Sequence, residues 1–103
     1  MMAYKFDNPY MSERERISFL QRVVLVHSYL YYMLDNPVWS DRQYDNVSVQ
    51  LVQMQNKHSK SWIKENTQYG YVFYDFDGTT GFDLYNRLID ADKKRIMQIG
   101  CLR

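Results

Sequence analysis

Residues 29–45 read Tyr-Leu-Tyr-Tyr-Met-Leu-Asp-Asn-Pro-Val-Trp-Ser-Asp-Arg-Gln-Tyr-Asp, and this stretch decides the fold. It joins the end of an aromatic-rich segment to the start of a second helix. Proline disfavours helical geometry in the residue before it, so Asn36-Pro37 predicts the end of the first helix. Ser40 and Gln43 have the spacing of a capping box, which begins a helix. The stretch therefore predicts a turn between two antiparallel helices.

The segment before this turn has the pattern of a long helix. Ser12 and Glu15 form another capping box, which predicts where that helix begins. Two apolar stripes follow: Ile17, Leu20, Val24, Tyr31 and Leu34, and then Phe19, Val23, Val26, Leu30 and Met33. A helix that is apolar on two sides must be covered on two sides. We expect the second helix to cover one side, and the C-terminal part or another subunit to cover the other.

The second helix is expected to run to about residue 57, and its apolar residues step by three and four along one face. That stripe consists of Tyr44, Val47, Leu51 and Met54. Together the two helices predict an antiparallel hairpin over residues 12–57, with a loop of roughly five residues.

The remaining residues, 58–103, are expected to form a C-terminal extension of the same domain. Residues 57–69 are polar, and residues 56–61 predict a loop or a frayed helix end. Trp62 and Ile63 are expected to anchor this part to the core. Residues 69–76 are aromatic and β-branched, which favours a short extended piece.

The last part of the chain predicts a turn and two short helices. Asp77-Gly78-Thr79-Thr80-Gly81 is a turn cluster. A short helix is expected over 82–88 and a last one over 91–100, capped by Asp90. The expected fold class is therefore mainly α. It is a long antiparallel helical hairpin with a C-terminal aromatic turn segment and one or two short helices, in one domain of residues 1–103.

Composition limits the functions that these residues suit. The net charge is +1, from 13 basic and 12 acidic residues, which argues against direct nucleic-acid binding or a polybasic membrane patch. A single cysteine, Cys101, fits a reducing compartment and excludes an internal disulfide. His27 and His58 lack the spacing of metal ligands. With no apolar leader and no segment long enough to span a bilayer, a cytoplasmic protein is expected.

Polar residues gather at the start of the second helix. Asp41, Tyr44 and Asp45 have i, i+3, i+4 spacing, which places them on one helix face. Carboxylates and phenols that converge there suit a flat, cationic ligand that carries hydroxyl groups. Two simpler roles stay open: the helix dipole favours acidic residues in the first turn, and tyrosines often serve cores and interfaces.

The same region resembles the N-terminal Ia domain of NAD-dependent bacterial DNA ligases. That domain has a helix that ends in a His-x-Tyr-Leu-Tyr-like run, a loop with proline, and a second helix that opens with Asp-x-x-Tyr-Asp. The matching residues, in order and without a gap, are His27, Tyr29, Leu30, Tyr31, Tyr32, Asp35, Pro37, Ser40, Asp41, Tyr44 and Asp45.

In that family the domain recognises the nicotinamide mononucleotide half of NAD. The resemblance implies nicotinamide mononucleotide or NAD as a ligand, and no cofactor is required. Tyr32 stands where the family has His or Tyr. The implied cofactor-binding residues are His27, Tyr31, Tyr32, Asp41, Tyr44 and Asp45.

Catalysis is not expected. The family's ligases carry a Lys-x-Asp-Gly nucleophile in another domain, and in Asp75-Phe76-Asp77-Gly78 an aspartate stands at the lysine position. The segment around Asp75 and Asp77 also looks like the first motif of haloacid-dehalogenase-type phosphatases, but that fold needs a parallel sheet for which too few residues follow. A turn is the expected role, and a ligand pocket that Asp75, Asp77 and Asp83 line together with the hairpin is the alternative. The chain is similar to small ligase-like proteins of phages and prophages, which implies a non-catalytic binding protein.

A function of another class also fits the composition. The chain has ten tyrosines, and its first helix carries a second apolar stripe. These features favour a protein–protein module or a homodimer. The alternative hypothesis is a small phage effector that binds and inhibits a host defence factor, such as a CRISPR nuclease, with no small-molecule ligand.

Overall fold

The computed structural model describes residues 11–35, 39–78 and 83–101, and these residues form helices, turns and bends without a β-strand. The mainly α fold class is therefore confirmed. Within the same ranges, none of the helices has the length and apolar character needed to cross a membrane.

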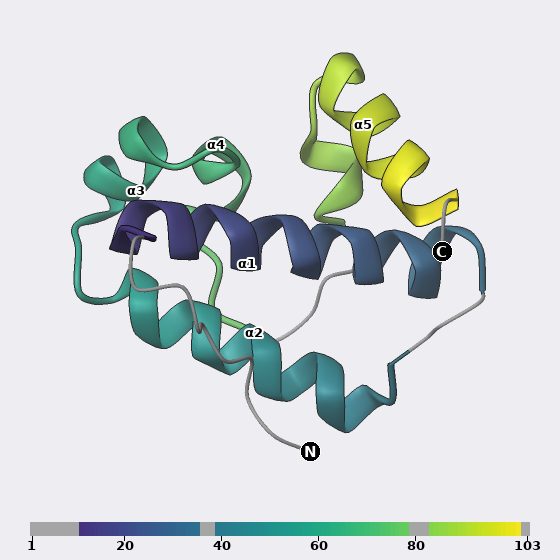
Figure 1. Ribbon diagram of the computed structural model, residues 1–103, viewed down its shortest axis with the longest axis horizontal. Helices are drawn as coiled ribbons and strands as arrows, with labels where there is room; N and C mark the ends of the chain where they lie inside the picture. Colours follow the sequence, from purple (N-terminus) through teal and green to yellow (C-terminus); the bar gives the residue numbers. More distant parts are fainter. Residues whose placement is uncertain (1–10, 36–38, 79–82, 102–103) are drawn as a thin grey trace.

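The helical hairpin forms as predicted. Helix α1 (Glu13–Ser28) and helix α2 (Asp41–Gln55) lie side by side and run in opposite directions (Figure 1). Both capping boxes are present: the Ser12 and Ser40 hydroxyls accept hydrogen bonds from the backbone N–H groups three residues on, at 3.2 and 3.1 Å. Helix α2 ends two residues earlier than expected.

The end of the first helix differs from the prediction. Helix α1 continues directly into a π-helical turn, η1 (Tyr29–Met33), which the Leu34 N–H closes on the Tyr29 carbonyl at 3.2 Å. Asp35 follows with a φ of 49°, in the left-handed region that ends helices. Asn36 and Pro37, which were predicted to stop the helix, lie outside the described residues.

The π turn changes which side chains face the core. The predicted stripes placed Tyr31, Met33 and Leu34 inside, but their exposed fractions are 36%, 47% and 43%. These three assignments were wrong because a π turn holds one more residue than an α turn and so rotates everything after it. Tyr29 and Leu30, at the start of the turn, are buried.

Helix α1 is covered on both sides, as its two stripes require. Helix α2 lies along one side, while α3 (Lys60–Asn66), α4 (Gly70–Phe73) and α5 (Asp90–Cys101) lie along the other (Figure 1). The second half of α1 and the start of η1 contribute an uninterrupted run of buried residues, 23–30, to the core. The C-terminal part of the chain thus provides the second cover.

Two predictions for the C-terminal part were wrong. Helix α3 begins at Lys60, within the predicted loop or frayed end of residues 56–61, with the Ser59 hydroxyl accepting from the Trp62 N–H at 3.1 Å. Residues 69–76 contain helix α4 in place of an extended piece, with the Tyr74 N–H bonded to the Gly70 carbonyl. Aromatic residues prefer strands only weakly, and tertiary contacts override the preference here.

Those contacts centre on Gln21, whose side chain is fully buried. Its amide nitrogen donates to Gln55 on α2 at 3.0 Å and to the Thr67 hydroxyl after α3 at 2.9 Å. Its carbonyl accepts from the Tyr69 N–H at 3.0 Å, and Gln55 in turn donates to the Phe73 carbonyl at 3.0 Å. One buried amide therefore ties α1 to α2 and to both short helices.

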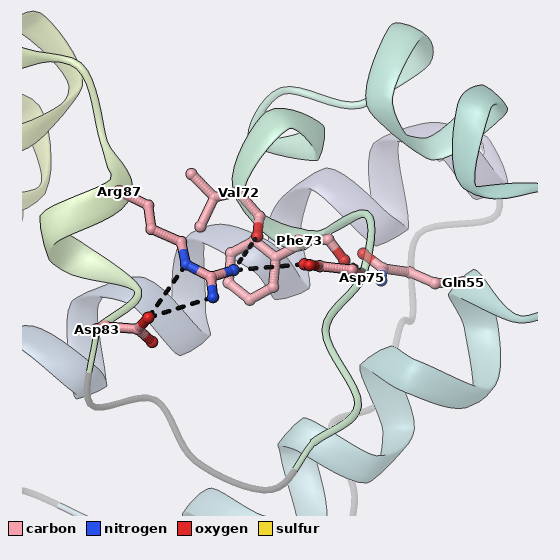
Figure 2. A network of polar contacts seen from close by, with 6 residues as sticks. All are labelled: Gln55, Val72, Phe73, Asp75, Asp83 and Arg87. Atoms are coloured by element: carbon pink, nitrogen blue, oxygen red, sulfur yellow. Dashed lines mark hydrogen bonds and ion pairs between the residues drawn. The ribbon is translucent and has the colours of Figure 1, made fainter.

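The last elements confirm the expected turn and helices only in part. Gly78 has a φ of 85°, and a 3₁₀ turn, η2 (Tyr85–Arg87), forms within the predicted 82–88 helix, whose first residue lies outside the described ones. Figure 2 shows that Arg87 bonds the Val72 carbonyl, Asp75 and Asp83, at 3.4, 3.3 and 3.2 Å. This guanidinium fastens η2 to the end of α4.

Replacing Gln21 with alanine should destabilise the fold by about 3 kcal/mol, because the buried Gln55 side-chain oxygen and the Tyr69 N–H lose their partner and the Thr67 hydroxyl loses a donor. Gln53→Ala is the matched control: Gln53 is exposed on α2, and its loss should change stability by less than about 0.5 kcal/mol. Urea unfolding followed by circular dichroism measures both. Equal losses in the two variants would contradict the role given to Gln21.

Gly70→Ala should cost about 3 kcal/mol, since an added Cβ would lie 2.0 Å from the Ile63 carbonyl oxygen, a backbone atom that cannot move aside. Gly100→Ala should change stability by at most about 1 kcal/mol, because two effects oppose each other. Alanine favours the helix more than glycine does, but its Cβ would lie only 3.0 Å from the Tyr29 ring. Thermal unfolding compares them. A Gly100 variant as unstable as the Gly70 variant would refute this account of the packing.

Candidate functional site

The sequence-predicted site residues meet at the end of the hairpin where its two helices are connected. His27 lies in the last turn of α1, Tyr31 and Tyr32 belong to η1, and the other three lie in the first turns of α2. In Figure 1 this is the right-hand end of α1. We call this group of six residues, His27, Tyr31, Tyr32, Asp41, Tyr44 and Asp45, the hairpin-end cluster.

Tyr31 and Asp41 connect the two halves of the hairpin-end cluster. The Asp41 carboxylate raises the pKa of Tyr31, first by its negative charge and second by a hydrogen bond with the phenol. The Tyr31 phenol therefore stays protonated as a donor to Asp41. Both side chains are exposed, so the pair lies at the surface where a ligand can reach it.

Tyr32 lies beside Tyr31, with ring centroids 4.7 Å apart and ring planes tilted by 59°. Its side chain is 38% exposed, close to the 36% of Tyr31. The π turn brings Tyr31, which a regular helix would turn toward the core, to solvent beside Tyr32. Two neighbouring exposed rings provide a surface on which a flat ring can stack.

Tyr44 is held inside the hairpin. Its hydroxyl lies 2.6 Å from the Ser28 hydroxyl, which pins α2 to the end of α1. Burial raises the pKa of Tyr44 to about 12. Asp45, the next residue, is exposed beside it. Tyr44 thus fixes the geometry, while Asp45 offers its carboxylate to solvent.

His27 is also buried in the hairpin and exposes little of its ring to a ligand. It is only 4% exposed, and its ring stacks on the Trp39 indole with centroids 3.5 Å apart and planes within 7° of parallel. Trp39 had no role in the sequence prediction. Its position between Asn36-Pro37 and the Ser40 cap was the available signal, because a tryptophan in a tight connection usually packs on a neighbouring element.

The C-terminal helix supports the same region from the other side of α1. Helix α5 contacts α1 and η1. Gly100 lets α5 approach the Tyr29 ring, and Tyr29 also packs against Tyr85, with centroids 4.9 Å apart. The buried start of η1 therefore rests on α5 and η2, and this fixes the position of the exposed end that carries Tyr31 and Tyr32.

The hairpin-end cluster combines two kinds of surface chemistry. Tyr31 and Tyr32 expose aromatic faces, which attract cations through the ring quadrupole. Asp41 and Asp45 expose carboxylates, which accept hydrogen bonds from hydroxyl groups and balance positive charge. An aromatic cation that bears a sugar would satisfy both kinds of group.

The residues of the phosphatase-like motif lie elsewhere. Asp75 pairs with Arg87, and Asp75 and Asp77 line a cleft of about 380 Å³ that also contains His58 and Lys60. In the part of the chain that the structure describes, no three His, Cys, Asp or Glu side chains are grouped as a metal site would require.

Comparison with known proteins identifies the family. The sequence model of one protein family, the DNA ligase-like, N-terminal NAD+-binding domain, matches residues 4–76 of this chain. These residues include the whole hairpin-end cluster. The DNA ligase of Lawsonia intracellularis is 35% identical over 52 residues, 50% of this chain and 8% of that protein. The DNA ligases of Thermoanaerobacter sp. (strain X514) and Frankia casuarinae are 38% and 39% identical over 47% and 45% of this chain, and 7% and 6% of their own lengths.

The matched segment thus spans less than a tenth of each of these ligases. No solved structure matches the chain. Because the family model covers residues 4–76, well over half of the 103, the chain belongs to the family of DNA ligase-like N-terminal NAD+-binding domains.

Proposed function

We propose that the hairpin-end cluster binds the nicotinamide mononucleotide part of NAD+, or nicotinamide mononucleotide itself. The observation that carries the proposal is that two neighbouring exposed tyrosine rings lie next to the exposed Asp41 carboxylate, with the exposed Asp45 one turn further along α2, in a chain of an NAD+-binding domain family. The oxidised nicotinamide ring is flat and positively charged, and it is attached to a ribose. These are the properties that the cluster's side chains complement.

Each residue has a distinct role in this proposal. Tyr31 and Tyr32 stack on the ring, and the carboxylates of Asp41 and Asp45 balance its charge and accept ribose hydroxyls. Tyr44 and His27 are positioning residues, because Ser28 and Trp39 already engage them in the hairpin. The hydrogen bond between Tyr31 and Asp41 orients both groups before the ligand arrives.

The proposed role is binding without catalysis. The 103 residues contain no Lys-x-Asp-Gly sequence, so they lack the nucleophile that adenylyl transfer by a ligase requires. The proposal includes a cytoplasmic protein of phage or prophage type, as the similarity to small ligase-like phage proteins implies.

The charge of the ring provides a sharp test. NAD+ and nicotinamide mononucleotide should raise the melting temperature, whereas NADH, whose reduced ring is neutral, should bind at least about tenfold more weakly. Isothermal calorimetry gives the dissociation constants and thermal shift the stabilisation. No shift at millimolar NAD+ or nicotinamide mononucleotide would refute the proposal, and equal affinity for NADH would refute the role of charge.

Substitutions then locate the site. Asp45→Asn keeps the shape of the side chain and removes its charge, and it should weaken NAD+ binding by about tenfold without lowering stability. Tyr31→Leu should weaken it as much by removing the stacking ring. Glu65→Gln, on the exposed face of α3, is the matched control and should bind normally. Unchanged affinity in both cluster variants would place the ligand elsewhere.

A protein–protein function is the second candidate, and one observation favours it. Four successive residues, Tyr31 to Leu34, are exposed by 36 to 47% although all of them are large and apolar or aromatic. Such contiguous patches often mark interaction sites. In this hypothesis the patch binds a host factor, such as a defence nuclease, and no small ligand is needed.

Met33→Gln and Leu34→Gln should separate the two functions, since both change the patch and leave the hairpin-end cluster intact. A binding partner isolated from host lysate should lose affinity for these variants by about tenfold, while Val49→Gln, an equally exposed apolar position on α2, should retain it. Surface plasmon resonance measures the affinities. If the partner binds both variants with unchanged affinity, this patch is not its binding site.

A further inference from the structure

A second cleft, of about 310 Å³, lies at the other end of α1. Arg14, Ser18 and Arg22 follow one another at four-residue intervals, and all three line it. Asn66 and Gln68, at the end of α3 and just beyond it, form the facing wall. The cleft is therefore a shallow site between α1 and the α3–α4 connection, separate from the hairpin-end cluster.

The guanidinium groups of Arg14 and Arg22 give this cleft two positive charges. Within the described residues, neither Arg14 nor Arg22 forms an ion pair with a carboxylate, whereas Arg87 and Arg95 do. Arg22 instead lies over the Phe19 ring, with its guanidinium carbon 5.6 Å from the ring centroid. That contact restrains the arginine and leaves its edge available to an anion.

Glu15 also lines the cleft, but its carboxylate is engaged in the helix cap. It accepts a hydrogen bond from the Ser12 N–H at 3.0 Å, and the bonds with Ser12, together with the charge of Arg14, lower its pKa. The carboxylate is thus held toward the start of the helix. Two cations and one anion leave the cleft with a positive charge.

Ser18 adds a hydrogen-bond donor between the arginines. Its oxygen accepts from the Gln68 N–H at 3.0 Å, which fixes the facing wall to α1. Since the oxygen is the acceptor in that bond, the hydroxyl proton is available to an anion in the cleft. Two guanidinium groups around a hydroxyl donor form an arrangement that suits the oxygen atoms of a phosphate group.

We infer that this cleft binds the phosphate group of a small phosphorylated molecule. A small ligand is favoured over a nucleic acid because the net charge is only +1, and nucleic-acid binding requires an extended basic surface. The volume is at the low end of the range for small-molecule sites, about 300 to 1,000 Å³, which fits a phosphate with a small organic part. This site goes beyond the proposed nicotinamide binding and shares no residue with it.

The test uses the full chain in a phosphate-free buffer at constant ionic strength. Inorganic phosphate and adenosine monophosphate are titrated while amide NMR signals are recorded. Signals of Ser18 and Gln68 should shift in a saturable way. Arg14→Gln and Arg22→Gln should each weaken binding by about tenfold, and Lys94→Gln, an exposed cation on α5, should leave it unchanged.

Glu15→Gln is a control that should change phosphate affinity in the opposite direction. Glutamine serves the same capping position in α2, where Gln43 accepts from the Ser40 N–H at 3.0 Å, so the helix should begin normally. Removing the negative charge should tighten phosphate binding by about threefold. Unaltered phosphate affinity in the Arg14→Gln, Arg22→Gln double variant would overturn the inference.

Two further measurements test the kind of ligand and the independence of the two sites. Tighter binding of a single-stranded oligonucleotide than of adenosine monophosphate would overturn the assignment to a small ligand. Asp45→Asn should leave phosphate binding at this cleft unchanged, whatever it does to NAD+ binding. Loss of the Ser18 and Gln68 shifts in that variant would show that the signals report the hairpin-end cluster, and would overturn the second site.

Discussion

The arrangement of this domain depends on one buried amide. Gln21 lies in the middle of α1, fully excluded from solvent, and bonds to groups on α2, after α3 and before α4. A buried amide is costly unless its donors and acceptors are matched, so only one register of the four segments satisfies it. Apolar contacts alone would tolerate a helix that slides or rotates. The amide converts a general hydrophobic association into a defined one.

That register is transmitted along α1 to the hairpin-end cluster. Because α1 is one rigid element, fixing its middle against α2 also fixes where Ser28 meets Tyr44, at 2.6 Å. The π turn then brings Tyr31 to solvent beside Tyr32, over a base formed by Tyr29, Tyr85 and α5. Irregular helical turns of this kind are frequent at functional sites, since they present side chains that a regular helix would bury.

The sequence predicted the parts of the fold that local rules govern. Both capping boxes and the core positions Val47 and Leu51 follow from spacing, and the structure has them. The π turn could not be predicted, because it replaces i→i+4 bonds with i→i+5 bonds without a residue that demands it. Helix α4 was missed for another reason: its aromatic sequence favours a strand, and the bond from the Tyr69 N–H to Gln21 is a long-range contact. Of the candidate site, Asp41, Tyr44 and Asp45 were grouped by local helical spacing, and the resemblance added Tyr31 across the turn.

The two proposed sites along α1 differ in electrostatic character, and this difference would separate their ligands. Acidic groups gather at the hairpin end, whereas the cleft along the first half of α1 is lined by Arg14 and Arg22 and by the capping carboxylate of Glu15. Neither arginine forms an ion pair within the described residues. From Ser18 to Tyr31 a helix spans about 20 Å at 1.5 Å per residue, further than one mononucleotide reaches. A single mononucleotide therefore cannot place its cationic ring on the tyrosines and its phosphate on the arginines. Any influence of one end on the other must pass through α1, whose middle Gln21 holds in place.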